Sequence, residues 1–144
     1  MEAVICDTVH GRDEFAALPD GLKKRFICDA RATVAVQSKR SEDFARIYRR
    51  LREKGLSPLV VKGISCRRLW KNPDARPSGD EDLLIRPEWL GDVLAVMEEN
   101  GFAVSREGDV VCYSPLSGLT VEIHTSLFPT DSEYFSGFNG CFDR

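Results

Sequence analysis

The sequence predicts an α+β fold: a mixed β-sheet with helices packed on one side, preceded by N-terminal helices. Three observations lead to this prediction. Apolar residues recur at helical spacing up to about residue 55 and again over 87–99. Two short apolar runs, 59–61 and 82–85, have the length of buried strands. From residue 102 onward the spacing changes to two, which is typical of strands joined in a meander.

Length and composition are those of one soluble globular domain. The 144 residues are 42% hydrophobic and 30% charged, and the net charge of −3 excludes a general binder of polyanions. No apolar run reaches transmembrane length and no signal peptide is recognisable, so we expect a cytoplasmic protein without membrane partners. Five scattered cysteines without a C-x-x-C pair argue against a disulfide framework and against structural zinc.

Helices are expected in the N-terminal third. A short helix is predicted around 13–18 and a second over 22–36. Over 41–54 the apolar residues fall at i, i+3, i+4 and i+7. Ser41 has the character of an N-cap and Gly55 that of a C′ residue, so this segment is predicted to be a separate third helix.

The second half is expected to alternate between strands and helices up to residue 101 and to consist of strands thereafter. In order, the expected elements are a strand at 59–61, a short helix at 64–70, a loop at 72–79, a strand at 82–85, a helix from Pro87 to Asn100-Gly101, and strands at 102–105, 110–113 and 119–125. Glu107-Gly108 and Ser117-Gly118 have the composition of hairpin turns.

The segment Arg76-Pro-Ser-Gly-Asp80-Glu-Asp82-Leu-Leu-Ile85 carries the strongest chemical signal. Asp80 and Asp82 stand two residues apart at the entry of a strand, so their side chains point to the same face. Two carboxylates on one face repel each other unless a cation lies between them, and oxygen ligands suit Mg²⁺ or Mn²⁺. Glu81 should point away from that face. The alternative interpretation of Asp-x-Asp alone is a solvated acidic turn.

A third carboxylate comes from the last strand. Glu122 and His124 share one of its faces, while Val121 and Ile123 share the other. Glu122 from a neighbouring strand would complete a metal cage. His124 either flanks the metal site or forms a hydrogen bond to a ligand carboxylate; the alternative is a partly buried histidine bonded to the backbone.

The segment Val61-Lys62-Gly63-Ile64-Ser65 leads from a strand through a glycine into a helix start. Backbone N–H groups at such a turn can face an anion, and Gly63 either permits close approach of a phosphate or merely ends the strand. A basic stretch follows, with a local charge of about +4 from Lys62, Arg67, Arg68, Lys71 and Arg76 against Asp74. Arg67 and Arg68 are expected on a solvated helix face. Arg76, beside the acidic motif, is expected to be functional.

Together these pieces resemble the uncharacterised bacterial nucleotidyltransferase family of the DNA polymerase β-like superfamily. The resemblance covers roughly residues 40 to 127 and is carried by Lys62-Gly63, the segment from Arg76 to Ile85, Gly101-Phe102, and Val121-Glu122-Ile123-His124. It implies a minimal nucleotidyltransferase fold, a metal triad of Asp80, Asp82 and Glu122, and nucleotide-phosphate contacts near Gly63 and Ser65. Two residues depart from the family pattern, since Ile64 replaces a small residue and Glu81 an apolar one.

The resemblance also suggests how the chain is organised. We expect an N-terminal helical segment at 1–55, a nucleotidyltransferase core at 56–127, and an aromatic-rich C-terminal segment at 128–144. Members of the family often continue into a larger C-terminal region. Independently of the resemblance, the residues of 128–144 crowd aromatic side chains into a stretch broken by proline and glycine. These side chains are expected either to pack against a further domain or a partner chain, or to cover the edge of the sheet.

The first functional hypothesis is transfer of a nucleoside monophosphate from an NTP to an unknown hydroxyl acceptor, a small molecule or a protein, with Mg²⁺ or Mn²⁺. Asp80 and Asp82 would hold the metals, Glu122 would help lower the pKa of the attacking hydroxyl, and Lys62 and Arg76 would neutralise the departing pyrophosphate. Without an aromatic-basic stripe, a nucleic-acid acceptor is not expected. The alternatives are a non-catalytic, antitoxin-like binding module on the same fold and a metal-dependent phosphodiesterase.

Overall fold

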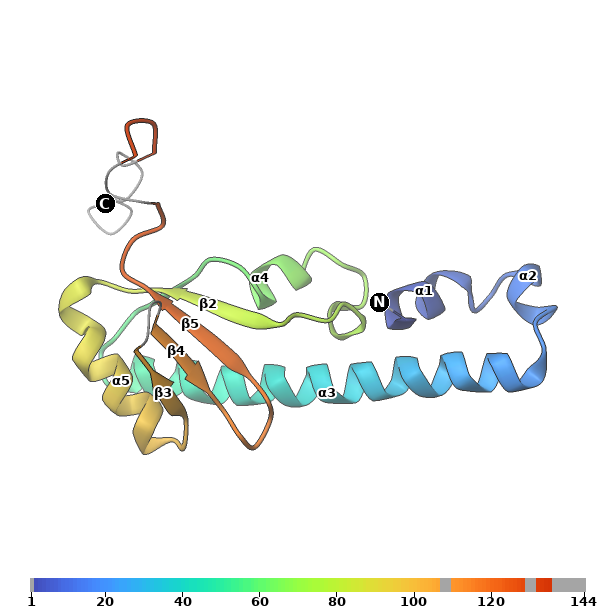
Figure 1. Ribbon diagram of the computed structural model, residues 1–144, viewed down its shortest axis with the longest axis horizontal. Coiled ribbons are helices and arrows are strands. Elements are labelled where there is room, and N and C mark those ends of the chain that lie inside the picture. Colours follow the sequence, from blue (N-terminus) through green and yellow to red (C-terminus); the bar gives the residue numbers. More distant parts are fainter. Residues whose placement is uncertain (1, 107–109, 129–131, 136–144) are drawn as a thin grey trace.

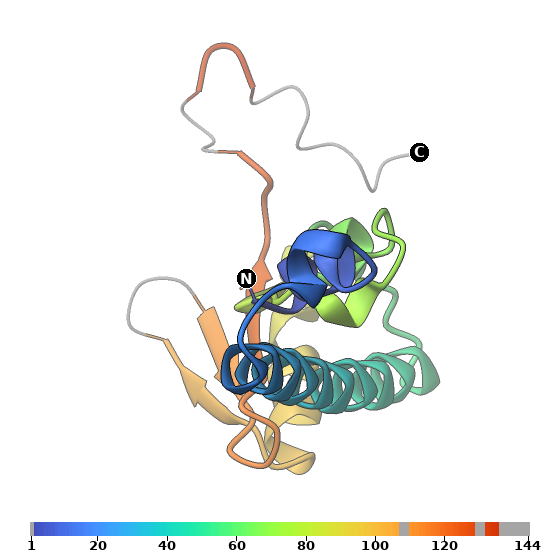
Figure 2. The same cartoon turned by 90° about the vertical axis from the view of Figure 1, so that its right-hand side faces the viewer.

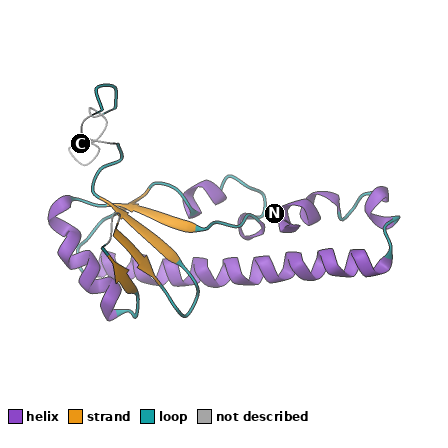
Figure 3. Ribbon diagram, in the orientation of Figure 1, coloured by secondary structure: helices purple, strands orange, loops and turns teal. Residues whose placement is uncertain are grey.

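The structure is a computed structural model that describes residues 2–106, 110–128 and 132–135. Its sheet has the strand order β1-β2-β5-β4-β3 and is mixed, because β2 and β5 run parallel while the other neighbours are antiparallel. The strands are β1 (Leu59–Val60), β2 (Asp80–Leu84), β3 (Ala103–Ser105), β4 (Val110–Tyr113) and β5 (Thr120–His124). Figure 3 shows these strands together with the helices, which confirms the α+β class.

The helices differ greatly in length. They are α1 (Glu2–Val9), α2 (Asp13–Ala16), α3 (Asp20–Glu53), α4 (Ile64–Arg67) and α5 (Leu90–Glu99), with the short 3₁₀ helices η1 (Pro73–Ala75) and η2 (Pro87–Trp89). In Figure 1 the C-terminal half of α3 lies against the sheet, and its N-terminal half extends beyond the sheet, where α1 packs along it. Among the described residues, none of the helices combines the length and the apolar character needed to cross a bilayer.

The hydrophobic core lies between one face of the sheet and helices α3 and α5. Figure 2 views α3 obliquely and shows this helix beside the strands. Strand alternation sends one set of side chains from β2 and β5 into this core and leaves the other set on the opposite face. The buried contributors include Phe44, Ile47 and Leu51 from α3, Val93 and Met97 from α5, and Leu83, Val121 and Ile123 from the sheet.

The two helices expected over 22–36 and 41–54 form one continuous helix, α3. Ser41, expected to cap a new helix, lies inside it and donates a hydrogen bond from its hydroxyl to the Gln37 carbonyl at 2.9 Å. The residues between the two segments contain neither Gly nor Pro, so nothing there breaks the helix. Ser41 also donates to the Asp74 carboxylate at 3.2 Å, which connects α3 to the loop before β2.

The predicted turns and the C-terminal segment are only partly described. Gly101 and Gly118 adopt positive φ values of 82° and 68°, as expected for the residue after α5 and for the turn before β5. The predicted turn at Glu107-Gly108 and most of the aromatic segment at 128–144 lie outside the described residues. Within the described part of that segment, the rings of Phe128 and Phe135 stack with centroids 5.2 Å apart.

Candidate active site

The candidate site is built on the parallel pair of strands at the centre of the sheet. In the β2–β5 register Asp82 is directly opposite Glu122, and Asp80 is opposite Thr120. Alternation along both strands places these side chains on the face that turns away from the core. His124, two residues after Glu122, shares that face. The sequence predicted this sharing of faces, but the parallel register is what places Asp82 beside Glu122.

Three side chains meet on this face. His124 Nε2 lies 3.0 Å from Asp82 Oδ1 and 3.6 Å from Glu122 Oε2. The donor atoms of these three residues all lie within 4.8 Å of one another. Two carboxylates and one imidazole at this spacing fit a divalent cation. His124 therefore contacts the carboxylate of Asp82, and its role beside a metal stays a prediction.

Lys62 supplies positive charge to the same carboxylate. Its Nζ lies 3.0 Å from Asp82 Oδ1; the Asp82 side chain is only 2% exposed, whereas that of Lys62 is 69% exposed. The hydrogen bond and the charge of Asp82 raise the pKa of Lys62, with smaller contributions from Glu122 and Asp80. Lys62 is held there by the sheet, because the N–H of the preceding residue donates to the Asp82 carbonyl at 3.1 Å.

Asp80 takes a more peripheral position than Asp82. It is half-buried at the first position of β2, and its carbonyl accepts a hydrogen bond from the Ser78 hydroxyl at 2.8 Å. It does not belong to the group of three donor residues. Its charge nevertheless acts on Lys62. Its role as a metal ligand therefore stays a prediction, supported by its shared strand face with Asp82.

Glu81 points to the opposite side, as expected, and is almost completely buried. Its Oε1 accepts a hydrogen bond from Arg67 Nη2 at 2.9 Å, and its Oε2 accepts one from the N–H of Ile64 at 2.5 Å. Burial raises the pKa of Glu81, an effect that these two donors partly offset. The Ile64 N–H, which we expected to be free for a phosphate, therefore has an internal acceptor.

Arg67 is the residue whose role the sequence analysis missed. We placed it on a solvated face of a helix, but its side chain is 0% exposed. Besides Glu81, its guanidinium contacts Asp74 Oδ1 at 3.2 Å and the Ser41 hydroxyl at 3.1 Å. Glu81 was the one feature of the sequence that could have indicated a buried arginine, because an acidic residue inside an apolar strand needs a buried positive partner. Arg67 thus joins α3, α4 and β2 on the side opposite to the carboxylate cluster.

Gly63 is required by this arrangement for a reason that differs from the predicted one. Its backbone has φ +58° and ψ −117°, a conformation that residues other than glycine adopt only with strain. A Cβ here would overlap the Glu81 carboxylate and would lie 2.9 Å from the Asp80 carbonyl oxygen. Glu81 therefore makes Gly63 necessary for packing, whatever Gly63 contributes to phosphate binding.

We expect Gly63→Ala to lower the free energy of unfolding by at least about 1–3 kcal/mol, because the backbone strain is added to the overlap with Glu81. Urea unfolding followed by circular dichroism measures this change. Gly91→Ala is the matched control, since a Cβ on this exposed α5 residue meets no atom within 4 Å. It is expected to stabilise the protein by up to about 1 kcal/mol. Equal stability of Gly63→Ala and the parent protein would contradict this account.

The other predicted nucleotide contacts lie at the surface or near it. Ser65 is exposed; its hydroxyl donates to the Val60 carbonyl at 3.2 Å, and its N–H donates to the Lys62 carbonyl at 3.2 Å. Arg76 is half-buried, with its guanidinium carbon 5.7 Å from the centre of the Trp70 ring, in a cation–π contact. Roles for Ser65 and Arg76 in nucleotide binding stay predictions.

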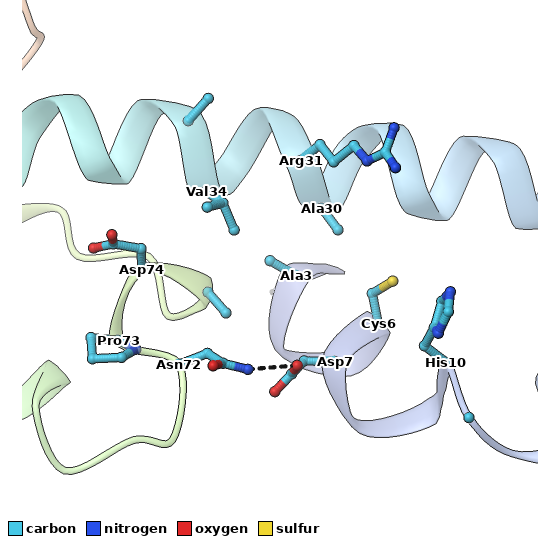
Figure 4. Close-up of a pocket in the computed structure, with 13 residues that line it drawn as sticks. Ala3, Cys6, Asp7, His10, Ala30, Arg31, Val34, Asn72, Pro73 and Asp74 are labelled. Atoms are coloured by element: carbon cyan, nitrogen blue, oxygen red, sulfur yellow. Dashed lines mark hydrogen bonds between the residues drawn. The ribbon is translucent and has the colours of Figure 1, made fainter.

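A large cavity lies elsewhere, between α1, α3 and η1 (Figure 4). Its volume is about 740 Å³, and small apolar residues such as Ala3, Ala30 and Val34 line much of it. At one side Asn72 Nδ2 donates to Asp7 Oδ1 at 2.6 Å. None of its lining residues belongs to the carboxylate cluster, so this cavity and the candidate active site are separate places in the fold.

A small mixed sheet with acidic residues on two adjacent parallel strands, and helices on the opposite face, has the architecture of a minimal nucleotidyltransferase. A family model described as "Uncharacterised nucleotidyltransferase" matches residues 2–144, and the chain belongs to this family. Searches among curated proteins and among solved structures give no significant match. The predicted family is thus confirmed, and the family itself leaves the reaction and the substrates open.

Proposed function

We propose that this protein transfers a nucleoside monophosphate from an NTP to a hydroxyl acceptor, using Asp80, Asp82 and Glu122 with a bound divalent cation. The observation that carries the proposal is the pairing of Asp82 with Glu122 on adjacent parallel strands, beside Lys62. This arrangement combines acidic ligands with an exposed cation on one face. A metal-bound triphosphate needs both kinds of group.

Three side chains at the site carry donor atoms suited to a divalent cation. Asp82 is buried and its carboxylate faces Glu122 and His124 within 4.8 Å, so the residues fit such an ion. A bound divalent cation would supply charge neutralisation and a lower pKa for the attacking hydroxyl. Side chains of the protein would orient the polyphosphate and neutralise its charge.

Lys62 is the residue best placed for the second task. In this structure its ammonium group is paired with Asp82, but its side chain is largely exposed and is therefore free to reorient. With a divalent cation held by Asp82, the ammonium group of Lys62 would need another anionic partner, and a phosphate oxygen would provide one. Arg76, which lies four residues before β2, is the second candidate for this role; in this structure its guanidinium contacts the Trp70 ring.

The proposal is tested by incubating the protein with each of the four NTPs, radiolabelled at the α-phosphate, together with Mg²⁺ or Mn²⁺ and a fractionated cell lysate. The expected result is a labelled acceptor accompanied by release of unlabelled pyrophosphate. Release of free nucleoside monophosphate without a labelled acceptor would instead indicate a phosphodiesterase. NTP binding without turnover in any fraction would indicate a binding module. Either of these results contradicts the proposal.

A further inference from the structure

We propose that His124 is itself a metal ligand, and that the centre formed by Asp82, Glu122 and His124 binds a first-row transition ion such as Mn²⁺ in preference to Mg²⁺. This inference deepens the proposed function and rests on it for the use of the metal. At this centre His124 is the third donor beside Asp82 and Glu122, whereas the proposed function also gives Asp80 a part in holding metal. The binding step that it describes is measurable without any nucleotide.

The geometry of the three side chains supports direct ligation. Ligand atoms about 2.0–2.2 Å from an ion lie about 3 Å apart when they occupy neighbouring octahedral positions. The distances from His124 Nε2 to Asp82 Oδ1 and to Glu122 Oε2 are 3.0 and 3.6 Å, close to this value. The backbone maintains the arrangement, since Asp82 and Glu122 are paired across two strands and His124 follows on the same face of β5.

The chemistry of the donors decides which ion is preferred. Mg²⁺ takes oxygen ligands almost exclusively and gains little from an imidazole, whereas transition ions accept imidazole nitrogen and carboxylate oxygen together. Asp80, the remaining carboxylate of the expected triad, lies outside the group of three, so the imidazole takes the third position. The site therefore offers two carboxylate oxygens and one imidazole nitrogen. This donor set favours Mn²⁺ and other first-row transition ions over Mg²⁺.

The competing explanation is that His124 only orients Asp82 through a hydrogen bond. In this structure Asp82 Oδ1 contacts both His124 Nε2 and Lys62 Nζ, each at 3.0 Å. A histidine that acts only as a donor would keep its bond to Asp82 when the metal is bound, and no nitrogen would touch the ion. Gln at this position keeps a hydrogen-bond donor but is a poor ligand for transition ions, so it separates the two explanations.

The experiment measures Mn²⁺ binding to the whole chain by electron paramagnetic resonance, with electron spin-echo modulation to detect nitrogen bonded to the ion. The variants are His124→Ala, His124→Gln and, as control, His10→Ala, which removes the other of the chain's two histidines. Competition by Mg²⁺ gives the affinity for that ion. Circular dichroism checks folding, which we expect to be preserved because the His124 side chain is 25% exposed.

The expected result is nitrogen modulation in the parent protein and in His10→Ala, and its loss in both His124 variants. Affinity for Mn²⁺ should fall roughly tenfold or more in both His124 variants, while affinity for Mg²⁺ changes by less than about threefold. Absence of nitrogen modulation in the parent, or unchanged Mn²⁺ affinity in His124→Gln, would overturn the inference. Because no nucleotide is present, a failure of nucleotidyl transfer leaves this result unaffected, and the two failures are distinguishable.

Discussion

Replacing Arg67 with Met is expected to lower the free energy of unfolding by about 3–5 kcal/mol, because it leaves the buried Glu81 carboxylate without its positive partner. Both side chains are almost fully buried and are joined by a 2.9 Å ion pair. Met has a similar length and fills the space, so loss of the charge dominates over loss of volume. Urea unfolding at neutral pH, followed by circular dichroism, gives the value.

Arg68→Met is the matched control for this prediction. Arg68 is the next residue in the chain but is exposed, so its replacement should change stability by less than about 0.5 kcal/mol. A double variant, Arg67→Met with Glu81→Leu, should be more stable than Arg67→Met alone, because it removes both buried charges. Among the described residues Arg67 Nε is buried without a hydrogen-bond partner, which adds to the cost of keeping this pair. A loss below about 1 kcal/mol for Arg67→Met would refute the prediction.

The loss of stability caused by Arg67→Met should depend on pH. Burial already raises the pKa of Glu81, and removal of Arg67 takes away a contribution that lowers it. A carboxyl whose pKa is higher in the folded state stabilises the fold below its unfolded-state pKa, and this stabilisation is lost as the pH rises through the folded-state pKa. The penalty of Arg67→Met should therefore be smallest at acidic pH and largest at neutral pH. The measurement is the free energy of unfolding of Arg67→Met and of the parent protein from acidic to neutral pH. The difference between the two should grow as the pH rises.

Asp82→Asn is expected to lower the rate of nucleotidyl transfer by about a hundredfold to a thousandfold, because the amide keeps the shape of the side chain but loses its charge. Asp82 is the residue on which Lys62, His124 and the facing Glu122 converge. No other position in the described part of the site combines burial of the carboxylate with these contacts. The measurement is transfer from an α-labelled NTP at saturating metal, together with Mn²⁺ affinity, which should also fall.

Asp92→Asn serves as the control for Asp82→Asn. Asp92 is an exposed residue near the start of α5, away from the strands that carry the cluster, so its replacement should leave transfer and metal affinity unchanged. Thermal unfolding of both variants verifies that they fold. If Asp82→Asn keeps more than about a tenth of the parent activity, the proposed role of Asp82 in holding the metal is wrong.

Local patterns were sufficient to predict which residues share a strand face. Side chains alternate along a strand whatever the strand pairs with, so the grouping of Asp80 with Asp82, and of Glu122 with His124, could be inferred from spacing alone. The direction of Glu81, away from that face, follows from the same rule. The family could also be inferred, because the order of several short motifs along the chain does not depend on how they pack.

Pairing between distant segments had to be seen in three dimensions. The contact of His124 with Asp82 depends on the parallel register of β2 and β5, in which a shift by one residue would separate the two side chains. The burial of Arg67 had no periodic signal, since α4 is one turn long and too short to show which face it buries. Glu81 and Gly63 likewise lie far apart in sequence and meet only in the folded chain. The space that the Glu81 carboxylate fills requires glycine at position 63, and spacing along the sequence could not show this.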